Sequence, residues 1–517
     1  MHSLRGALER PIVGIVIGSP SSRQFGLRRL SACASDTYAQ RFDGEWKMTV
    51  SDTSIRPLPG PTGLRGNLRV LNRLLKDPTT SLDECAALYG PTFAVRVGPL
   101  RFVVVGDPAH LSDVFSQPNA SYRWGFALNV LGFIVGPTSM IVSDGEDHHR
   151  RRAAVQPAFA RRRLDGWIPM ILSEADRMID ERLQPALADH GSTDLYPLGK
   201  DLVLAITVKA FFGNGLEHRT AEIGTIFDEL QAYLELPGPK QIPHRIPFTQ
   251  RARARAARHR FDRIVDEEVA RRRGERAVNP SAETAETGDL LDVFVDEATS
   301  TMTTEEIHDQ VNTLIGAGYN TTAATLAWTV WRALTTPDVW QQLRTEAEET
   351  FGDGEVPGPE TLRQLPYAAA VVHEALRLHP AGSFAPRQAV TDVPIGDHVI
   401  GKNAMVIWSP YLAGRNPDAW PDPLEFRPDR HLNPTPDAAA AQMESAWVPF
   451  GKGPRRCIGF ALAQMELTLI LARLAQRLDL QAVNRTTPKP HGMVVNRPTG
   501  GVIVQLASPS RTEGTNQ

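Results

Sequence analysis

The chain has 517 residues, and 42% of them are hydrophobic, which is the proportion of a folded globular protein rather than a disordered one. Lys and Arg number 56 and Asp and Glu 59, a net charge of −3, which gives no global reason to bind nucleic acid or acidic membranes. Three cysteines, Cys33, Cys85 and Cys457, are too few for a disulfide framework, so a reducing, cytoplasmic location is expected. The longest early apolar run, residues 12–17, is far shorter than the roughly 20 residues that span a membrane.

The N-terminal part divides into segments of different composition. Residues 1–47 carry basic and small residues with little periodicity and are expected to be an unstructured leader, with Met48 as the natural start. A targeting or regulatory arm is the alternative. Residues 48–75 are expected to be a proline-rich arm, because the stretch IRPLPGP favours extended backbone. The main domain is then 76–507, followed by a disordered polar tail at 508–517.

A small β region is expected near the start of the main domain. The stretch TFAVRVGPLRFVVV, residues 92–105, alternates apolar and polar residues around Gly98-Pro99, and this pattern predicts a β-hairpin. Asp107 followed by Pro108 predicts the start of a helix, with Asp107 as its cap.

Most of the remaining chain has helical patterns. Thr303 and Glu306 form a capping box, which predicts a helix that continues to about Leu334, and the next helix is expected to start at 336–337. Another helix is predicted over residues 366–378. No internal repeat is evident and no linker splits the core. The expected fold is mainly α with a small β region, in one large domain.

The most informative stretch is FGKGPRRCIG, which delivers Cys457 to the first turn of a predicted amphipathic helix. A helix N-terminus lowers the pKa of a cysteine, so the thiolate is the expected form. Gly453 permits a tight turn, Gly459 lets a flat group approach, Phe450 shields the sulfur from water, and Arg455 supplies a nearby cation.

Cys457 has three other interpretations. A zinc or iron–sulfur site is disfavoured, since it needs more cysteines or histidines close by in the sequence. A nucleophilic cysteine needs a base beside it, which the sequence neither supplies nor excludes. A buried cysteine at a helix end is the structural alternative.

The stretch FGKGPRRCIG closely resembles the haem-binding signature of the cytochrome P-450 superfamily. The resemblance implies the cytochrome P-450 fold, with residues 76–507 as a single haem domain. It implies haem b (iron protoporphyrin IX) as the cofactor and Cys457 as the axial ligand of its iron. Phe450 and Arg455 would then contact the cofactor.

A pair of charged residues supports the resemblance. Glu374 and Arg377 lie three residues apart in AAAVVHEALRLHP, and apolar neighbours on most faces argue for a buried pair rather than a solvated one. They match the ExxR motif of the family, which implies a structural trio with Arg430 of FRPDRHL. His431 departs from the family pattern, in which an aromatic residue is commoner.

A basic stretch, DGEDHHRRRAAVQPAF, contains His148 and Arg152 on one helical face. A solvated charged face is the ordinary interpretation, and the lack of interleaved aromatic residues argues against a nucleic-acid patch. The resemblance implies that both residues bind the haem propionates, together with Arg387 and Arg455. The neighbouring arginines, 150–151 and 161–163, are expected to form a docking face for an acidic electron donor.

The middle of the long predicted helix reads LIGAGYNTTAATLAWT. The resemblance aligns Gly318 with the haem face, and it gives Thr321 and Asn320 catalytic positions, with Thr321 facing dioxygen. Thr321 could instead bond back to the carbonyl one turn earlier. Asn320 stands where the family has an acid, and an amide does not titrate, so proton delivery must rely on Thr321 and water or the chemistry is not ordinary hydroxylation.

The expected substrate is apolar. Three segments, 122–142, 381–386 and 493–495, are rich in apolar residues and would line the pocket in this family, although core packing explains them equally well. The implied function is a monooxygenase that inserts one atom of O2 into a terpenoid, steroid or fatty acyl substrate, with electrons from a separate ferredoxin or flavodoxin and its reductase. One alternative is a haem-thiolate enzyme that rearranges, couples or uses peroxide without external electrons. The other is a non-catalytic haem sensor.

Overall fold

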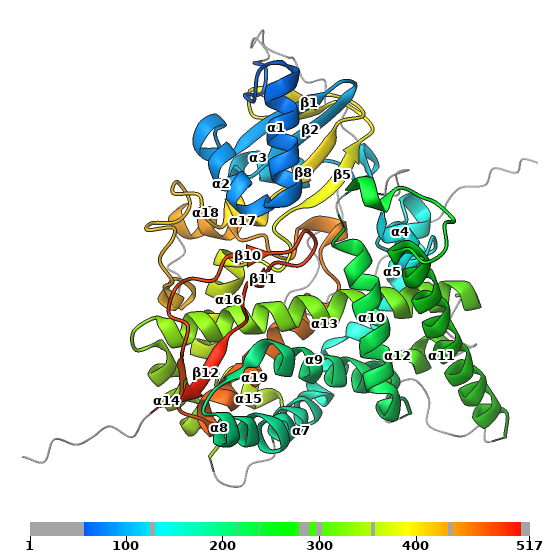
Figure 1. Cartoon of the computed structure of the whole chain (residues 1–517), viewed down its shortest axis with the longest axis vertical. Coiled ribbons are helices and arrows are strands. Elements are labelled where there is room, and N and C mark those ends of the chain that lie inside the picture. Colours follow the sequence, from blue (N-terminus) through cyan, green and yellow to red (C-terminus); the bar gives the residue numbers. More distant parts are fainter. Residues whose placement is uncertain are drawn as a thin grey trace, which may run out of the picture. The chain divides into compact units, whose positions relative to one another are not determined.

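Helices make up most of the described chain, with four small sheets beside them (Figure 1). The computed structural model describes residues 56–124, 130–213, 215–236, 238–278, 289–295, 302–352, 357–432 and 438–507. The expected leader, Cys33 and the expected tail lie outside the described residues. The prediction of a mainly α fold with a small β region is confirmed.

The largest sheet of the described chain has five strands in the order β1-β2-β8-β5-β3. The strands are β1 (Thr92–Val97), β2 (Leu100–Val105), β3 (Tyr122–Arg123), β5 (Ala385–Ala389) and β8 (Met405–Trp408). β1 and β2 form the predicted antiparallel hairpin, and Gly98 adopts φ +57 in its turn. β8 runs parallel to β2 and antiparallel to β5. The inner side chains of the hairpin, such as Phe93 and Val104, pack against Leu82 and Cys85 of the neighbouring helix α2 (Pro78–Tyr89).

Three smaller sheets complete the β structure of the described residues. One has the order β4-β12-β9, and the others are the pairs β6-β7 and β10-β11. Their bounds are β4 (Thr193–Asp194), β6 (Val393–Ile395), β7 (His398–Ile400), β9 (Leu480–Ala482), β10 (Pro490–His491), β11 (Arg497–Pro498) and β12 (Ile503–Leu506).

The central helix is α13 (Thr304–Thr335), with 32 residues and the predicted capping box between Thr303 and Glu306. At about 1.5 Å per residue it is ~48 Å long. Side chains on most faces of α13 are buried, since it packs against α9 (Leu195–Phe212), α16 (Pro366–Leu378) and α19 (Phe460–Arg477). Figure 1 shows α13 running through the helical part of the fold with α9 and α19 beside it.

The other helices surround this centre. They are α1 (Gly63–Lys76), α2 (Pro78–Tyr89), α3 (Pro108–Ser116), α4 (Val130–Val135), α5 (Gly145–Val155), α6 (Arg161–Gly166), α7 (Ile168–Met178), α8 (Gln184–His190), α10 (Thr220–Leu234), α11 (Gln250–Val278), α12 (Leu290–Val295), α14 (Val339–Thr350), α15 (Pro359–Arg363), α17 (Pro410–Ala413) and α18 (Ala438–Ala446). Asp107 caps α3 as predicted, because its carboxylate accepts hydrogen bonds from the N–H groups of Ala109 and His110.

Two boundaries differ from those predicted. The helix after α13 begins at Val339, preceded by Asp338 at φ +63, and not at 336–337. Residues 63–75, the second half of the expected proline-rich arm at 48–75, lie in helix α1 (Gly63–Lys76). Val70, Leu71 and Leu74 of α1 pack against the cluster that includes the hairpin, so this segment joins the fold rather than preceding it.

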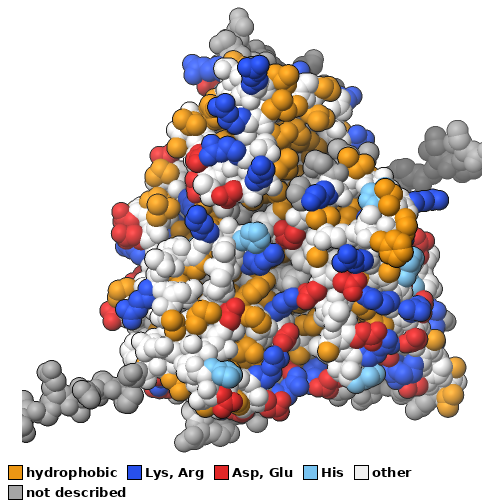
Figure 2. Space-filling model, in the orientation of Figure 1, with side chains coloured by type: hydrophobic (Ala, Val, Ile, Leu, Met, Phe, Trp, Pro, Cys, Tyr) orange, Lys and Arg blue, Asp and Glu red, His pale blue; other side chains and the backbone are white. Residues whose placement is uncertain are grey.

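Charged side chains on the visible face are mixed rather than sorted by sign. Figure 2 shows Lys and Arg among Asp and Glu over the region of α10, α11 and α12. Ion pairs account for this mixing: Arg260 of α11 binds Glu229 of α10 at 2.8 Å, and Arg258 binds Asp262 within α11 at 2.7 Å. The many arginines of α11 therefore do not make a purely basic surface.

Candidate active site

A cavity of about 390 Å³ lies inside the helical part of the described chain. Its walls come from α5, α9, α13 and α19, from the segment 381–385 and from the turn 449–459. Apolar side chains such as Phe211, Leu314 and Leu467 make up much of the lining. The cavity therefore has the size and the apolar character of a small-molecule site.

Cys457 reaches this cavity from a tight turn. Gly451 and Gly453 adopt φ +66 and +71, and the Cys457 N–H donates to the carbonyl of Phe450 at 2.9 Å, which closes the turn. Helix α19 begins only at Phe460, so the prediction that Cys457 lies in the first helical turn is wrong by three residues. The Cys457 side chain lies inside the protein, and its accessible surface faces the cavity.

The surroundings of the Cys457 sulfur act in opposite directions on its protonation. Burial raises the pKa of the thiol, while a hydrogen bond from the Gly459 N–H and the charges of Arg152 and Arg456 act to lower it. Burial prevails, so the expectation that the turn alone favours the thiolate is wrong. A metal ion bound to the sulfur would supply the missing charge and hold the thiolate.

Two side chains of α5 line the cavity near the sulfur. His148 is buried, and its burial together with the charges of Arg455 and Arg152 lowers the pKa of the imidazole to about 3. Burial also lowers the pKa of Arg152. Among the described residues Arg152 has no carboxylate within ion-pair distance, and Nδ1 of His148 has no hydrogen-bond partner.

Two further basic residues, Arg387 and Arg455, come from other elements. Arg387 of β5 is buried against the rings of Tyr122 and Trp124, 4.6 and 5.4 Å from their centroids, and its Nε has no partner in the described chain. Burial lowers the pKa of Arg387 to about 10. Arg455 lines the cavity and binds the carboxylate of Asp144 at 3.0 Å, with its Nε also unpartnered. Arg387 is not among the residues that line the cavity directly.

On α13, Gly318 and Thr321 line the cavity, whereas Asn320 does not. A Cβ at Gly318 would meet no atom within 4 Å, so this stretch of helix presents open space to the cavity. The Thr321 hydroxyl donates to the Ala317 carbonyl at 2.6 Å, the back-bonded geometry that the sequence left open. Asn320 is buried on another face of the helix.

The trio of Glu374, Arg377 and Arg430 is assembled as the sequence predicted. Arg377 binds both carboxylate oxygens of Glu374, at 2.7 and 2.8 Å, and Nε of Arg430 lies 3.3 Å from Glu374 Oε1. His431, to which no role was given, places Nε2 2.9 Å from Glu374 Oε2. Trp447, just before the cysteine turn, donates its Nε1–H to the carbonyl of His373 in the same helix as Glu374. These contacts tie α16 to the turn that carries Cys457.

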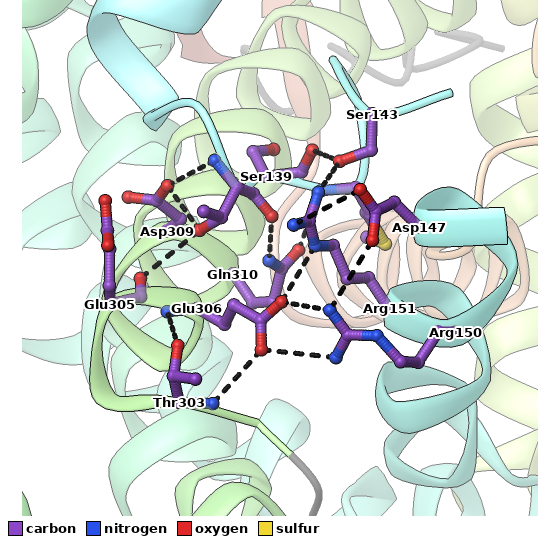
Figure 3. Close-up of polar contacts among 12 residues, drawn as sticks. Ser139, Ser143, Asp147, Arg150, Arg151, Thr303, Glu305, Glu306, Asp309 and Gln310 are labelled. Atoms are coloured by element: carbon purple, nitrogen blue, oxygen red, sulfur yellow. Dashed lines mark hydrogen bonds and ion pairs between the residues drawn. The ribbon is translucent and has the colours of Figure 1, made fainter. Parts of the chain in front are cut away.

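One wall of the cavity is a loop, 136–143, that is bound to the N-terminal part of α13 (Figure 3). The carboxylate of Asp309 accepts hydrogen bonds from the N–H and hydroxyl of Thr138, and the Gln310 side chain bonds the N–H of Met140. Gly136 is required at its position, because a Cβ there would overlap the Asp309 carboxylate. Met140 and its neighbour Ile141 project into the cavity from this fixed backbone.

Contacts in the same region bear on the predicted docking face at residues 150–151 and 161–163. Figure 3 shows Arg150 and Arg151 of α5 pointing toward Glu306, and both form ion pairs with it. Arg161 in turn binds Asp165 at 2.8 Å. Arg151 is buried in this contact and cannot belong to a basic surface, whereas Arg150 and Arg161 are paired but exposed. The docking face for an electron donor stays a prediction for the exposed arginines.

The family model for cytochrome P450 matches residues 57–504. The chain belongs to the cytochrome P450 family. It is 33% identical over 435 residues to a cytochrome P450 139 of Mycobacterium tuberculosis, which covers 82% of this chain and 97% of that protein. It is 29% identical over 442 residues to cyclooctat-9-en-7-ol 5-monooxygenase of Streptomyces melanosporofaciens, covering 83% of this chain and 90% of that protein. The solved structure of retinoic acid-bound cyanobacterial CYP120A1 covers 88% of this chain and 100% of its own, at 22% identity and a TM-score of 0.74.

As a cytochrome P450, the protein is a haem-containing oxidoreductase of the monooxygenase type. The residues present fit that cofactor. Among the described residues, the Cys457 thiol opens into the cavity and Gly318 leaves room for a flat group. Arg152 and Arg455 line the cavity, and the Nε atoms of Arg387 and Arg455 have no hydrogen-bond partner in the described chain, so donors remain for the anionic propionates. No described helix combines the length and the apolar character that crossing a bilayer requires.

Sequence reasoning located part of the cavity wall and missed part of it. Of the predicted segment 122–142, Trp124 and Met140 line the cavity, and residues 125–129 lie outside the described residues. Residues of the 381–385 stretch also line the cavity, whereas 493–495 do not. Two features were not predicted. Thr207 and Phe211 of α9 line the cavity, although they look like ordinary core residues of an apolar helix. Glu466 of α19 also lines it, as an acid within an otherwise apolar stretch.

Proposed function

We propose that this cytochrome P450 inserts one atom of O2 into an apolar substrate of the terpenoid, steroid or fatty acyl type. Its electrons would come from a separate ferredoxin or flavodoxin with its reductase, and its cofactor would be haem b in a cytoplasmic protein. The observation that carries the proposal is a single apolar cavity that contains both Cys457 and Thr321.

The character of the cavity supports an apolar substrate. Three different elements contribute apolar side chains to its lining, namely Phe211, Leu314 and Ile141. The arginines of the lining lie on α5 and beside Cys457, where the cofactor would bind and pair with them. A relative at 29% identity carries the name cyclooctat-9-en-7-ol 5-monooxygenase, which agrees with an oxidation at carbon of a mostly hydrocarbon molecule.

Each proposed site residue has a physical role. Haem, when bound, supplies the oxygen chemistry through its thiolate-ligated iron. Cys457 would ligate the iron, and His148, Arg152, Arg387 and Arg455 would bind the propionates by charge-assisted hydrogen bonds. Phe450 would shield the sulfur from water, while Gly318 leaves the cofactor face open. Thr321 would offer its hydroxyl oxygen to hydrogen bonds inside the cavity.

The test is product analysis with labelled oxygen. The haem-loaded protein is incubated under ¹⁸O2 with an NADPH-driven ferredoxin system and a library of terpenoids, steroids and fatty acids. The proposal expects a product that carries one labelled atom and requires the electron donor. A product that forms from hydrogen peroxide alone, or without any oxidant or reductant, would favour the alternative reaction class. Absence of any ligand-induced spectral change and of any product across the library would contradict the proposal.

The alternative has one specific observation in its favour. Asn320 replaces the acid of the family motif and does not titrate, so the ordinary route for protons at α13 is altered. A haem-thiolate enzyme that catalyses rearrangement, coupling or peroxide-driven oxidation needs no delivery of external electrons. Omitting the reductase in the experiment above separates the two.

A further inference from the structure

Glu466 places a carboxyl group in the cavity wall without a partner. It lies in α19, its side chain is buried, and its Oε1 has no hydrogen-bond partner in the described chain. It is the one Asp or Glu among the described residues that line the cavity. Its neighbours in the wall on the same helix are Leu462, Ala463 and Leu467.

Burial keeps this carboxyl group protonated. Burial raises the pKa of Glu466 to about 8, and no charged group contributes to the shift. At pH 7 the side chain is therefore mostly a neutral acid that carries a donor O–H.

The charged groups on the helices around α19 are engaged elsewhere. Asp176 of α7 binds Arg473 at 2.7 Å, and His373 of α16 contacts the Gln464 amide at 2.5 Å. Glu374 of α16 is held by Arg377, Arg332 of α13 bonds His379, and Arg344 of α14 pairs with Glu348. Across the cavity, the titratable and charged groups are His148, Arg152, Arg455, Arg456 and Cys457.

A structural role does not account for the residue. A buried carboxyl group without a hydrogen bond is unfavourable relative to an apolar side chain of similar size, and α19 is apolar on both sides of it. Within the described chain the carboxyl group is therefore left to give a hydrogen bond or a proton to a group inside the cavity.

Hydrogen-bond acceptors for this O–H group line the same cavity on α13. The Thr325 hydroxyl donates to the carbonyl of Thr321 at 2.9 Å, and the Thr321 hydroxyl donates to the carbonyl of Ala317 at 2.6 Å. Because each hydroxyl hydrogen is used in this way, each oxygen keeps its lone pairs for the cavity. Asn320, in contrast, neither titrates nor lines the cavity.

We propose that Glu466 is the proton-holding acid of this cavity and takes over the role that Asn320 cannot fill. The inference rests on the proposed monooxygenase function, in which each oxygen insertion consumes two electrons from the reductase and two protons. In the step assigned to Glu466, its carboxyl O–H bond breaks, the proton ends in the water that forms from the second atom of O2, and a carboxylate remains. A proton from the bulk solvent then restores the carboxyl group.

The decisive variant is Glu466→Gln, which keeps the shape of the side chain and removes its acidity. The matched control is Glu348→Gln, the same substitution at a half-exposed residue of α14. Infrared spectroscopy of the haem-loaded protein first tests protonation without turnover. We expect a protonated-carboxyl C=O band at pH 6 that fades above about pH 8, is absent in Glu466→Gln and is unchanged in the control. A wild-type spectrum identical to that of Glu466→Gln at pH 6 would overturn the proposal.

The second measurement is coupling, the fraction of reductase electrons recovered as product rather than as hydrogen peroxide. We expect Glu466→Gln to lower coupling at pH 7 on the order of tenfold. Wild-type coupling should fall between pH 7 and 9, and the variant should lose this dependence. Wild-type coupling and pH profile in Glu466→Gln would overturn the assignment even if the infrared band is present. If the wild type forms no product, the proposed function fails, and the infrared result still reports on Glu466 separately.

Discussion

Nε2 of His431 lies 2.9 Å from Oε2 of Glu374, inside the cluster that ties α16 to the cysteine turn. Arg377 binds the same carboxylate through two nitrogens, and the backbone N–H of Arg427 donates to it at 2.9 Å. Burial acts to raise the pKa of Glu374, but the hydrogen bonds from Arg377 and His431 outweigh it and lower the pKa to about 2. Glu374 is therefore ionised at neutral pH, and the His431 imidazole donates a hydrogen bond to its carboxylate.

Glu374→Gln removes the charge at the centre of this cluster and leaves Arg377 buried without a counter-charge. We expect a loss of about 3–5 kcal/mol in the free energy of unfolding, measured by chemical denaturation. Glu360→Gln is the matched control, because Glu360 and Arg363 form the same i, i+3 pair with both side chains exposed. Its loss should stay below about 1 kcal/mol. Equal effects of the two substitutions would contradict the buried-pair interpretation.

His431→Phe places at this position the aromatic type that the family resemblance favours. Because it removes a donor to a charged group, we expect a loss of about 1.5–3 kcal/mol at pH 7. The folded-state pKa of Glu374 lies below its ordinary value, so the stabilisation from its partners is present above about pH 4.5 and is lost as the pH falls toward 2. Wild type and His431→Phe should converge in stability over that acidic range. A constant difference across it would rule out the proposed bond.

Arg387→Leu should affect the protein and its cofactor in opposite directions. Arg387 is a buried cation without a carboxylate partner in the described chain, so the apolar replacement should raise or preserve the unfolding midpoint of the haem-free protein. Haem retention should fall, measured as faster haem transfer to an acceptor protein. Arg455→Leu is the comparison, since it removes the ion pair with Asp144 and should lower both the unfolding midpoint and haem retention. Unchanged haem transfer in Arg387→Leu would refute its propionate role.

Glu306→Gln removes the ion pairs that connect Arg150 and Arg151 of α5 to α13. Hydrogen bonds from Arg150 and Arg151 outweigh burial and lower the pKa of Glu306 to about 2. We expect a loss of about 1–3 kcal/mol in stability and faster hydrogen exchange of the α5 amides. Asp147→Asn is the control, because Asp147 is largely exposed and lies 3.8–3.9 Å from the same arginines. Its effect should be below about 0.5 kcal/mol.

Glu466→Gln should also change how stability depends on pH. The folded protein holds a proton on Glu466 up to about pH 8, whereas the unfolded chain releases it near pH 4.5. The native state therefore binds more protons in this window, and the wild-type free energy of unfolding should decrease there, by at most about 5 kcal/mol relative to the variant. Denaturation curves at pH 5 and pH 8.5 test this. Parallel behaviour of the two proteins would show that Glu466 is ionised at neutral pH.

The sequence predictions that the structure confirms depend on residues that are close together in the chain. The capping box at Thr303, the hairpin at 92–105 and the helix at 366–378 each depend on a few neighbouring residues, and each forms with bounds close to those expected. The glycines of the cysteine turn likewise require only local backbone geometry, and two of them adopt positive φ.

Contacts between distant segments could not be predicted in the same way. The pairing of Arg151 with Glu306 joins residues 155 positions apart, and nothing in the basic run itself shows that it faces an acid. Glu466 looks like one polar position on an amphipathic helix until the fold turns it toward the cavity. The placement of Asn320 away from the cavity depends on the rotation of α13, which the sequence pattern leaves undetermined.

The central claim is that Cys457 ligates haem iron as a thiolate in this cavity. The most direct measurement is the absorption spectrum of the reduced, haem-loaded protein under carbon monoxide, with Cys457→His as the comparison. The proposed ligation predicts a Soret band displaced far to the red in the wild type and its loss in the variant, which retains haem through imidazole. A folded, haem-loaded wild type without that displaced band would contradict it.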